Sequence, residues 1–342
     1  MEERRTTIRM AIEDHVTALM TDNASGYTLK QRREHLEWFA AWVYAAHGIV
    51  YVDELQVKHL REWINLLQKR PSLHGGGKLS DASVQSYGRS LAAFCHWLER
   101  EEVIEKPITT HFRLPRAEKK FIPTFTPEEV EMLLAACEAD RKHSPQLRKA
   151  LTARNRAMVS VLVDTGIRRS ELAGLRLGDV DRDLRVLLVH RKGNKWQQVP
   201  ISYDGFKPLH EYLMKHRHYL ARLDGSMVAR KNDPVFLSEH GKPLTPAGVS
   251  HLFESLQERT GIEGKRVSPH NCRRYMATMQ LASGRSPLDV QRQMGHTTLT
   301  MTNHYASLSV EHLKRSHDAH SPLRLKQGGS NAGSGSGYWD EE

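Results

Sequence analysis

Cysteine and long apolar runs are both scarce in this sequence. Its 342 residues include three scattered cysteines, Cys95, Cys137 and Cys272, and no CxxC pair. This argues against a disulfide framework and a zinc–cysteine cluster, and it suits a reducing compartment. No apolar run approaches the roughly 18 residues of a membrane span, and the first ten residues, MEERRTTIRM, are charged rather than typical of a signal peptide. We therefore expect a soluble cytoplasmic protein that is not embedded in a membrane.

Metal-ligand patterns and internal repeats are missing as well. No glutamate-rich set has the spacing of a metal site, and no segment recurs at a fixed period. Cys272 is adjacent to Arg273, but a lone cysteine in an apolar context indicates a small buried residue rather than a reactive thiol. The sequence therefore predicts no metal and no other cofactor.

Positive charge is in excess. Fifty lysines and arginines against forty acidic residues give a formal net charge of +10 and a pI near 9.5. This balance favours a polyanionic partner, either nucleic acid or an acidic membrane surface, and it says nothing about the fold. The length predicts two domains, each large enough to bury a core.

The first domain is predicted to be helical and to span residues 1–110. Apolar residues recur with helical spacing in four segments, 1–20, 29–48, 52–69 and 82–101. A capping box from Thr28 to Gln31 is expected to begin the second helix, Gly48 to end it, and Ser80 to cap the fourth. The segments contain five aromatic residues that we interpret as core rather than as platforms for stacking bases: Trp38, Phe39, Trp42, Trp63 and Trp97.

Residues 111–125 are predicted to form a basic linker. Prolines prevent this segment from being one helix, and its cations are Arg113, Arg116, Lys119 and Lys120. Two interpretations stay open, since such a run is either simply solvated or follows a phosphate backbone.

The second domain is predicted to span residues 126–320 and to mix helices with a small antiparallel β-hairpin. Period-two alternation runs through residues 186–200, with a two-residue turn at Gly193-Asn194. Lys192 and Lys195 lie at the tip of this hairpin. The remaining residues, 321–342, are rich in Gly and Ser and are expected to be a disordered tail.

The chemistry is concentrated between Ser268 and Leu308. This stretch contains His270, Arg273, His296 and Tyr305. Ser-Pro pairs before His270 and at residues 286–287 predict two helix starts, and Gly295 predicts a helix stop just before His296. An arginine fork binds phosphate oxygens, a tyrosine can attack phosphorus, and histidines can move the protons near neutral pH.

A second patch, Asp164 to Leu172, follows an apolar run. Gly166 breaks that run, and Arg168 lies where the chain turns into the next helix. Arg169 either contacts phosphate or is solvated, and Glu171, taken by itself, is an ordinary exposed helix residue.

Four segments of the chain, TGIRRSEL, RKGNKWQQVP, HNCRR and MGHTTLTMTNHY, resemble in order and spacing the signature boxes of the tyrosine recombinases, or integrases. The resemblance is strong over residues 121–320 and loose over residues 10–105. It implies a mainly α protein, with an N-terminal four-helix SAM-like DNA-binding bundle and a C-terminal mixed α/β catalytic domain.

The resemblance also implies a role for each matching residue. Arg168 and Arg273 would clamp the scissile phosphate, with Glu171 supporting Arg168. His270 and His296 would help with protons and hydrogen bonds, and Tyr305 would be the nucleophile. The family's hairpin lysine matches Lys192, with Lys195 as the rival. The implied partners are double-stranded DNA, three further copies of the chain on that DNA, and accessory or sister recombinases.

Two departures from the usual boxes stand out. Arg274 occupies a position where histidine is common, so a phosphate contact is expected there, and Met294 replaces a leucine with similar volume. Two other functions stay open, a DNA-binding protein of this fold without chemistry and a topoisomerase-like relaxer. The sequence does not select among integration, excision, dimer resolution and transposition, because these share one active site.

Overall fold

The computed structural model describes residues 5–72, 77–115, 123–191, 195–225 and 229–295. The chain divides into two compact units, Met1–Phe121 and Ile122–Glu342. The predicted linker lies at this division, but its boundaries stay a prediction because residues 116–122 are outside the described ranges. None of the helices in those ranges is long and apolar enough to cross a membrane.

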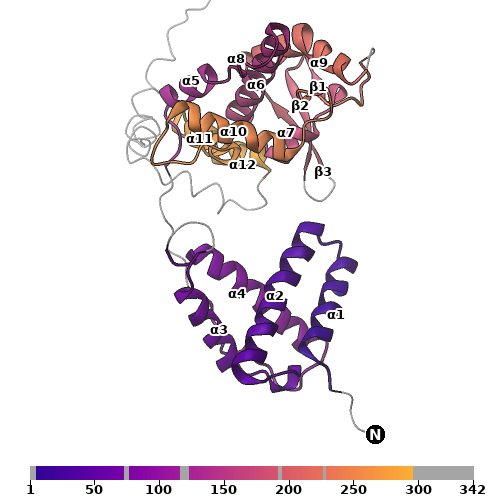
Figure 1. Cartoon of the computed structure of the whole chain (residues 1–342), viewed down its shortest axis with the longest axis vertical. Coiled ribbons are helices and arrows are strands. Elements are labelled where there is room, and N and C mark those ends of the chain that lie inside the picture. The colour runs from indigo at the N-terminus through magenta and orange to yellow at the C-terminus, as the bar shows by residue number, and fades with distance from the viewer. Residues whose placement is uncertain (1–4, 73–76, 116–122, 192–194, 226–228, 296–342) are drawn as a thin grey trace, which may run out of the picture. The chain divides into compact units, whose positions relative to one another are not determined.

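The first unit is a bundle of helices (Figure 1). Its elements are α1 (Ile8–Thr21), α2 (Gly26–His47), a 3₁₀ turn (Val52–Glu54), α3 (Val57–Lys69) and α4 (Asp81–Arg100). Gly48 ends α2 with a φ of 68°, and the Ser80 hydroxyl accepts the Ser83 N–H to cap α4, as the sequence predicted.

The predicted start of α2 is wrong by three residues. The Ser25 hydroxyl, not that of Thr28, caps this helix by accepting the Thr28 N–H at 3.2 Å. Thr28 therefore lies inside the first turn, where its own hydroxyl is 2.8 Å from that of Ser25. Two good capping residues stood three positions apart, and the upstream one begins the helix.

The core of the first unit is aromatic. Phe39, Trp63 and Trp97 are buried, and Trp38 and Trp42 pack against them. Ring centroids of Trp38 and Trp63 lie 5.2 Å apart with an interplanar angle of 87°, an edge-to-face contact. The interpretation of these residues as core is confirmed.

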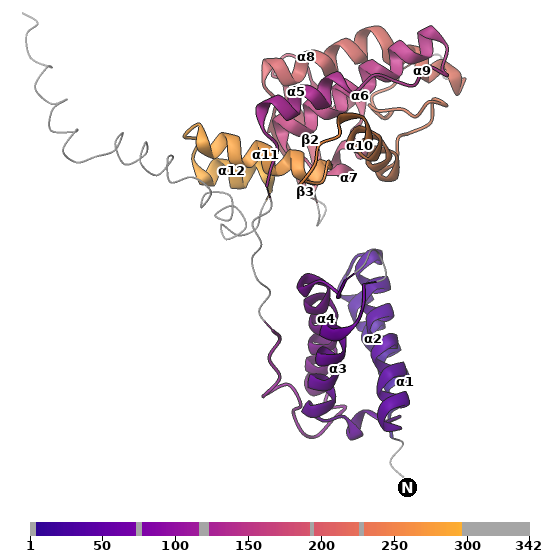
Figure 2. The same cartoon turned by 60° about the vertical axis from the view of Figure 1, so that its left-hand side comes forward.

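The second unit contains the remaining described helices and strands, and its helices are arranged around α6 (Figures 1 and 2). Its helices are α5 (Pro127–Ala135), α6 (Pro145–Thr165), α7 (Arg169–Gly174), α8 (Tyr203–Glu211), a π turn (Tyr212–His216), α9 (Arg217–Leu223), α10 (Pro246–Thr260), α11 (Pro269–Ala282) and α12 (Pro287–Met294), with a 3₁₀ turn at Leu177–Asp179. Helix α6 is buried mainly through residues 157–162 and packs against α5, α8 and α11.

A three-stranded antiparallel sheet lies beside these helices, in the order β1-β2-β3. The strands are β1 (Val180–Asp181), β2 (Val186–Arg191) and β3 (Lys195–Pro200). Leu187, Val189 and Val199 are buried, while Leu188 and Trp196 are exposed. The fold class expected from the sequence, mainly helical with a small antiparallel sheet, is confirmed.

The predicted two-residue turn of the hairpin is wrong. Arg191 pairs with Lys195 and Val186 with Pro200, so the register is centred on residue 193. A turn made only of Gly193 and Asn194 would instead pair residue 192 with Lys195. Three residues, 192–194, therefore connect the strands, and they lie outside the described residues.

Candidate active site

Arg168 and Glu171 are brought together by the turn between α6 and α7. Gly166 ends α6 with a φ of 63°, in the left-handed region that favours glycine. The Arg168 backbone N–H then donates to Glu171 Oε2 at 2.7 Å, and its Nη1 donates to Oε1 at 2.8 Å. The Glu171 side chain is 4% exposed and that of Arg168 is 42% exposed. Glu171 is therefore not an ordinary exposed glutamate.

Helix α11 presents His270 and Arg273 from its first turn. Ser268 caps this helix by accepting the Asn271 N–H, and Pro269 occupies its first position, as predicted. Arg273 is buried and donates from Nη1 to the Gly166 carbonyl and from Nη2 to the Met294 carbonyl, both at 2.5 Å. Its guanidinium thus joins the end of α6 to the end of α12.

A third arginine completes the connection between Arg168 and Arg273. Arg191, at the end of β2, donates from Nη1 to Glu171 Oε2 at 2.9 Å and to the Met294 carbonyl at 3.1 Å. A continuous path of hydrogen bonds therefore runs from Arg168 through Glu171, Arg191 and Met294 to Arg273. It brings together residues more than one hundred positions apart in the sequence.

Helix α12 precedes His296, and the carbonyls at its end accept hydrogen bonds from Arg191 and Arg273. Ser286 caps α12, Pro287 begins it, and Gly295 ends it with a φ of 63°, all as predicted. Met294 is fully buried, in a small cluster with Met276, Leu281 and Val290, so the methionine that departs from the family box is a core residue.

His270 lies among positive charges. Partial burial and the charges of Arg274, Arg273 and Arg168 lower the pKa of His270 below its ordinary value of 6.5. Its imidazole is therefore neutral at pH 7, so one ring nitrogen donates and the other accepts. A neutral imidazole can take up a proton or donate a hydrogen bond to an anionic oxygen.

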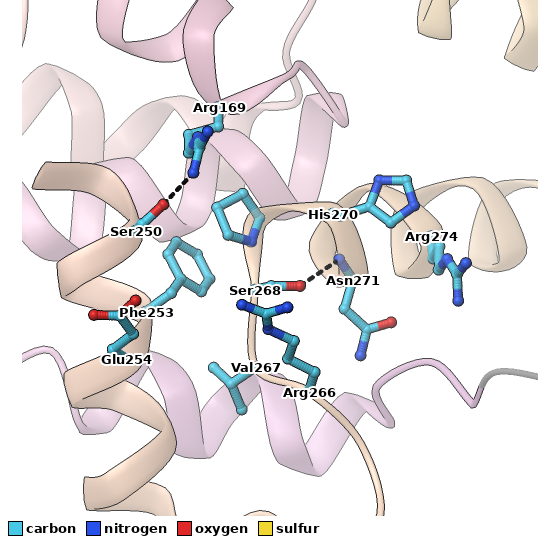
Figure 3. A pocket seen from close by; sticks show the side chains of 11 residues that line it. Arg169, Ser250, Phe253, Glu254, Arg266, Val267, Ser268, His270, Asn271 and Arg274 are labelled. Atoms are coloured by element: carbon cyan, nitrogen blue, oxygen red, sulfur yellow. Dashed lines mark hydrogen bonds between the residues drawn. The ribbon is translucent and has the colours of Figure 1, made fainter. Parts of the chain in front are cut away.

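A cavity of about 510 Å³ opens beside His270, between α10 and the start of α11 (Figure 3). Its lining includes three arginines, Arg169, Arg266 and Arg274, against one carboxylate, Glu254, and the Arg169 guanidinium donates to the Ser250 hydroxyl. Figure 3 shows His270 and Arg274 on one side of α11, with Arg169 reaching toward Ser250. Arg274 is half-buried and Arg169 is exposed. The cavity adjoining His270 is thus suited to anions.

Several predicted residues cannot be placed. Those that lie outside the described residues are Lys192, His296 and Tyr305, together with Arg116, Lys119, Lys120 and the tail 321–342. Arg113 is exposed at the end of the first unit, and Lys195 is exposed at the start of β3. Cys272 is fully buried, which confirms its interpretation as a core residue, and burial raises the pKa of its thiol.

Arg191 is the functional candidate that sequence reasoning missed. The alternation of β2 did contain a signal, because Leu187, Val189 and Arg191 share one face and the first two are apolar. An arginine beside a hairpin tip is usually solvated, so only the structure reveals that it points into the protein.

Comparison with known proteins supports the resemblance of the four sequence boxes to the tyrosine recombinases. A family model described as the phage integrase family matches residues 123–312. Tyrosine recombinase XerC of Anoxybacillus flavithermus is 32% identical over 292 residues, which cover 85% of this chain and 90% of the relative. Tyrosine recombinase XerC 2 of Ralstonia nicotianae is 31% identical, with 92% and 86% covered.

Solved structures agree at the level of the fold. An integrase of the transposon Tn1549, in complex with transposon right end DNA, has a TM-score of 0.70 at 20% identity and covers 94% of this chain and 100% of its own. The XerH site-specific recombinase, bound to its difH substrate after cleavage, has a TM-score of 0.66 at 21% identity, covering 88% and 81%.

The fold and the match of the sequence boxes define a tyrosine recombinase, an enzyme of site-specific recombination. The chain belongs to the phage integrase family.

Proposed function

We propose that this enzyme cuts and rejoins double-stranded DNA through a covalent bond between Tyr305 and a 3′ phosphate, without metal or ATP. The observation that carries the proposal is the hydrogen-bonded path that joins Arg168 to Arg273 through Glu171, Arg191 and the end of α12. The DNA bound in the complexes of the transposon integrase and of XerH supports double-stranded DNA as the substrate.

Arg168 and Arg273 would neutralise the scissile phosphate. In the transition state the non-bridging oxygens gain negative charge, and cations that are already fixed stabilise it most effectively. Burial and carbonyl partners fix Arg273, and Glu171 orients Arg168 while leaving part of its side chain exposed. His270 and His296 would add hydrogen bonds to the same oxygens.

The proposed step balances without a cofactor. The Tyr305 oxygen attacks phosphorus, the bond to the 5′ oxygen breaks, and a neutral histidine accepts the phenol proton. The leaving 5′ oxygen takes a proton from a lysine ammonium, for which Lys192 is the first choice and Lys195 the alternative. The phosphotyrosyl bond conserves the ester's energy, so a 5′ hydroxyl from a second duplex can reverse the step.

Further DNA contacts are proposed for cations outside this set. Arg169 and Arg274, in the cavity beside His270, would meet backbone phosphates near the cleaved one. Arg113, Arg116, Lys119 and Lys120 would follow the backbone between the two units. Strand exchange through a Holliday junction requires two duplexes, and we propose a homotetramer on DNA, with accessory or sister proteins setting direction.

The first experiment identifies the DNA sequence that the enzyme cleaves. Protein is isolated from cells under denaturing conditions, and the DNA that remains attached is sequenced, with Tyr305→Phe as the control. Sites enriched with the wild-type chain and lost with Tyr305→Phe are expected. A nicked duplex of the recovered sequence should then trap the adduct in vitro.

Each alternative function has its own outcome in these experiments. Sequence-preferring binding without any adduct would leave a DNA-binding protein that does no chemistry. Adducts together with relaxation of supercoiled DNA, but without Holliday junctions, would indicate a topoisomerase-like relaxer.

A further inference from the structure

Arg191 is a buried cation with an unusually complete set of partners. It lies at the end of β2 with a side chain that is 6% exposed. Its Nε donates to Gln197 Oε1 at 3.1 Å, and its Nη2 donates to the Gln293 carbonyl at 2.6 Å. Its Nη1 is shared between Glu171 Oε2 and the Met294 carbonyl. The guanidinium thus contacts α7, β3 and α12.

We infer that Arg191 is a positioning residue of the recombinase active site, one that sets both the charge at Arg168 and the position of the end of α12. The inference rests on the proposed function. We propose no contact of Arg191 with DNA or with a reacting atom. It acts through Glu171 and the end of α12, to which it donates hydrogen bonds.

The first effect is on charge. Glu171 is a single buried carboxylate that bonds two guanidiniums, so Arg168, Arg191 and Glu171 together carry a net positive charge. Without Arg191, Glu171 and Arg168 would form a neutral pair. A neutral pair attracts a phosphate less strongly than a cation does, so Arg191 lets Glu171 orient Arg168 without cancelling its charge.

The second effect is on the end of α12. The last carbonyls of a helix have no partner within the helix and carry partial negative charge. Two of them, on Gln293 and Met294, accept from Arg191, and Arg273 also donates to Met294. These arginines therefore fix the end of α12, which directly precedes Gly295 and His296 in the sequence.

Gly295 is shaped to admit the guanidinium. A Cβ atom at Gly295 would lie 3.1 Å from Arg191 Nε and 3.2 Å from its Cζ. The missing side chain therefore allows Arg191 to reach the helix end. Lys192, the first choice for the catalytic lysine, follows Arg191 directly in the chain and lies outside the described residues.

The test compares Arg191→Met and Arg191→Lys with a matched control, Arg217→Met. Arg217 is equally buried and also donates to carbonyls, those of Pro234 and Val235, but it makes none of the site contacts. The full-length protein is used with the nicked duplex. Adduct formation is followed at saturating protein, together with DNA affinity and the folded fraction from urea unfolding.

For Arg191→Met we expect adduct formation at saturating protein to slow by about 10²-fold at equal folded fraction, because misplaced groups cost that much in rate. DNA affinity should fall only by the weakened attraction of Arg168 for one phosphate. Arg191→Lys should recover part of the rate, since it keeps the charge but not the fork. Arg217→Met should keep the wild-type rate. Equal rates for Arg191→Met and Arg217→Met would overturn the inference.

A second measurement does not depend on catalysis. Amide hydrogen exchange across residues 290–295 should accelerate in Arg191→Met and not in Arg217→Met. If the wild-type chain forms no adduct, the proposed chemistry fails, and the exchange result still decides whether Arg191 holds α12. Unchanged exchange in Arg191→Met would then refute its positioning role.

Discussion

Glu171 is an acidic side chain inside a site whose other charged groups are cationic, and its two oxygens accept from Arg168 and Arg191 at 2.8 and 2.9 Å. Replacing it with glutamine keeps the shape but leaves the buried Arg191 charge without its counterion. Breaking a buried pair in this way costs about 3–5 kcal/mol. We therefore expect Glu171→Gln to lower the free energy of unfolding by about that amount in urea titrations.

The control for that change is Glu254→Gln on α10. Glu254 is 64% exposed and its nearest ionic partner is His251, so we expect a loss below about 1 kcal/mol. Equal losses in the two variants would show that the Glu171 carboxylate does not hold the two arginines.

His15 is a buried histidine whose ring nitrogens have no hydrogen-bond partner among the described residues. Burial and the charges of Arg32 and Arg100 lower the pKa of His15 to about 4. The unfolded chain, with the ordinary pKa of 6.5, takes up this proton first as the pH falls. The first unit should therefore lose about 2 kcal/mol of stability between pH 7 and pH 5.

Tryptophan fluorescence during urea unfolding measures this loss, because four of the six tryptophans lie in the first unit. His15→Leu keeps an apolar side chain against Phe94 and Trp97 and should remove most of the pH dependence. The pKa values of His35 and His59 are also lowered, mainly by burial, so a smaller slope should remain. An undiminished slope in His15→Leu would assign the effect to those residues.

At the scale of single residues, the sequence marks the candidate catalytic residues more clearly than the residues that support them. Arg168, His270 and Arg273 stand out because arginine and histidine at helix starts have few structural uses. Arg191 does not stand out, because its partners are carbonyls of Gln293 and Met294 about one hundred positions away. Backbone acceptors carry no sequence signal, so contacts of this kind require the fold.

Among the elements, the end of α6 is the most tightly restricted. Gly166 has a φ of 63°, and a Cβ there would lie 2.2 Å from Met276 Cε. Its carbonyl also accepts from Arg273. Gly166→Ala combines the cost of a left-handed conformation, about 1–2 kcal/mol, with displacement of Met276. We expect a loss of about 2–4 kcal/mol in the free energy of unfolding.

Gly261 supplies the matched control, because it ends α10 with a φ of 60° and a Cβ atom there would have no neighbour within 4 Å. Gly261→Ala measures the backbone cost alone, about 1–2 kcal/mol. The excess in Gly166→Ala should shrink when Met276→Ala is added. No difference between the two glycine variants would show that Met276 yields without cost.

Helix boundaries were predicted well where a glycine ends the helix or a serine caps its start. Gly48, Gly295, Ser80 and Ser268 all end or begin helices at the expected place. The hairpin turn failed because Gly-Asn suits both two- and three-residue connections, and the register depends on how Leu187 and Val199 fit the core. Strand β1 was missed because two residues show no alternation.

At the scale of the whole molecule, the excess of positive charge leads to a quantitative prediction for DNA binding. Each phosphate that a cation neutralises releases condensed counterions, so the logarithm of affinity falls with the logarithm of salt concentration. A net charge of +10 alone does not set that slope, because only cations that contact phosphates contribute. Variants of equal charge but different position therefore separate contact from general attraction.

Replacing Arg113, Arg116, Lys119 and Lys120 by glutamine should reduce the salt slope by about one unit per residue, if these cations follow the backbone as proposed. The matched variant replaces Arg141, Lys142, Arg148 and Lys149, which are exposed near the start of α6. Three of these line a cavity with Lys207 and Glu211 that contains none of the site residues. Both variants remove the same charge, so long-range attraction changes about equally, and the affinity of the second should fall with an almost unchanged slope.

Fluorescence anisotropy with a labelled duplex, titrated at several salt concentrations, gives both slopes. Equal slopes would mean that the linker cations are merely solvated, and the DNA path would then have to be sought on other faces of the two units.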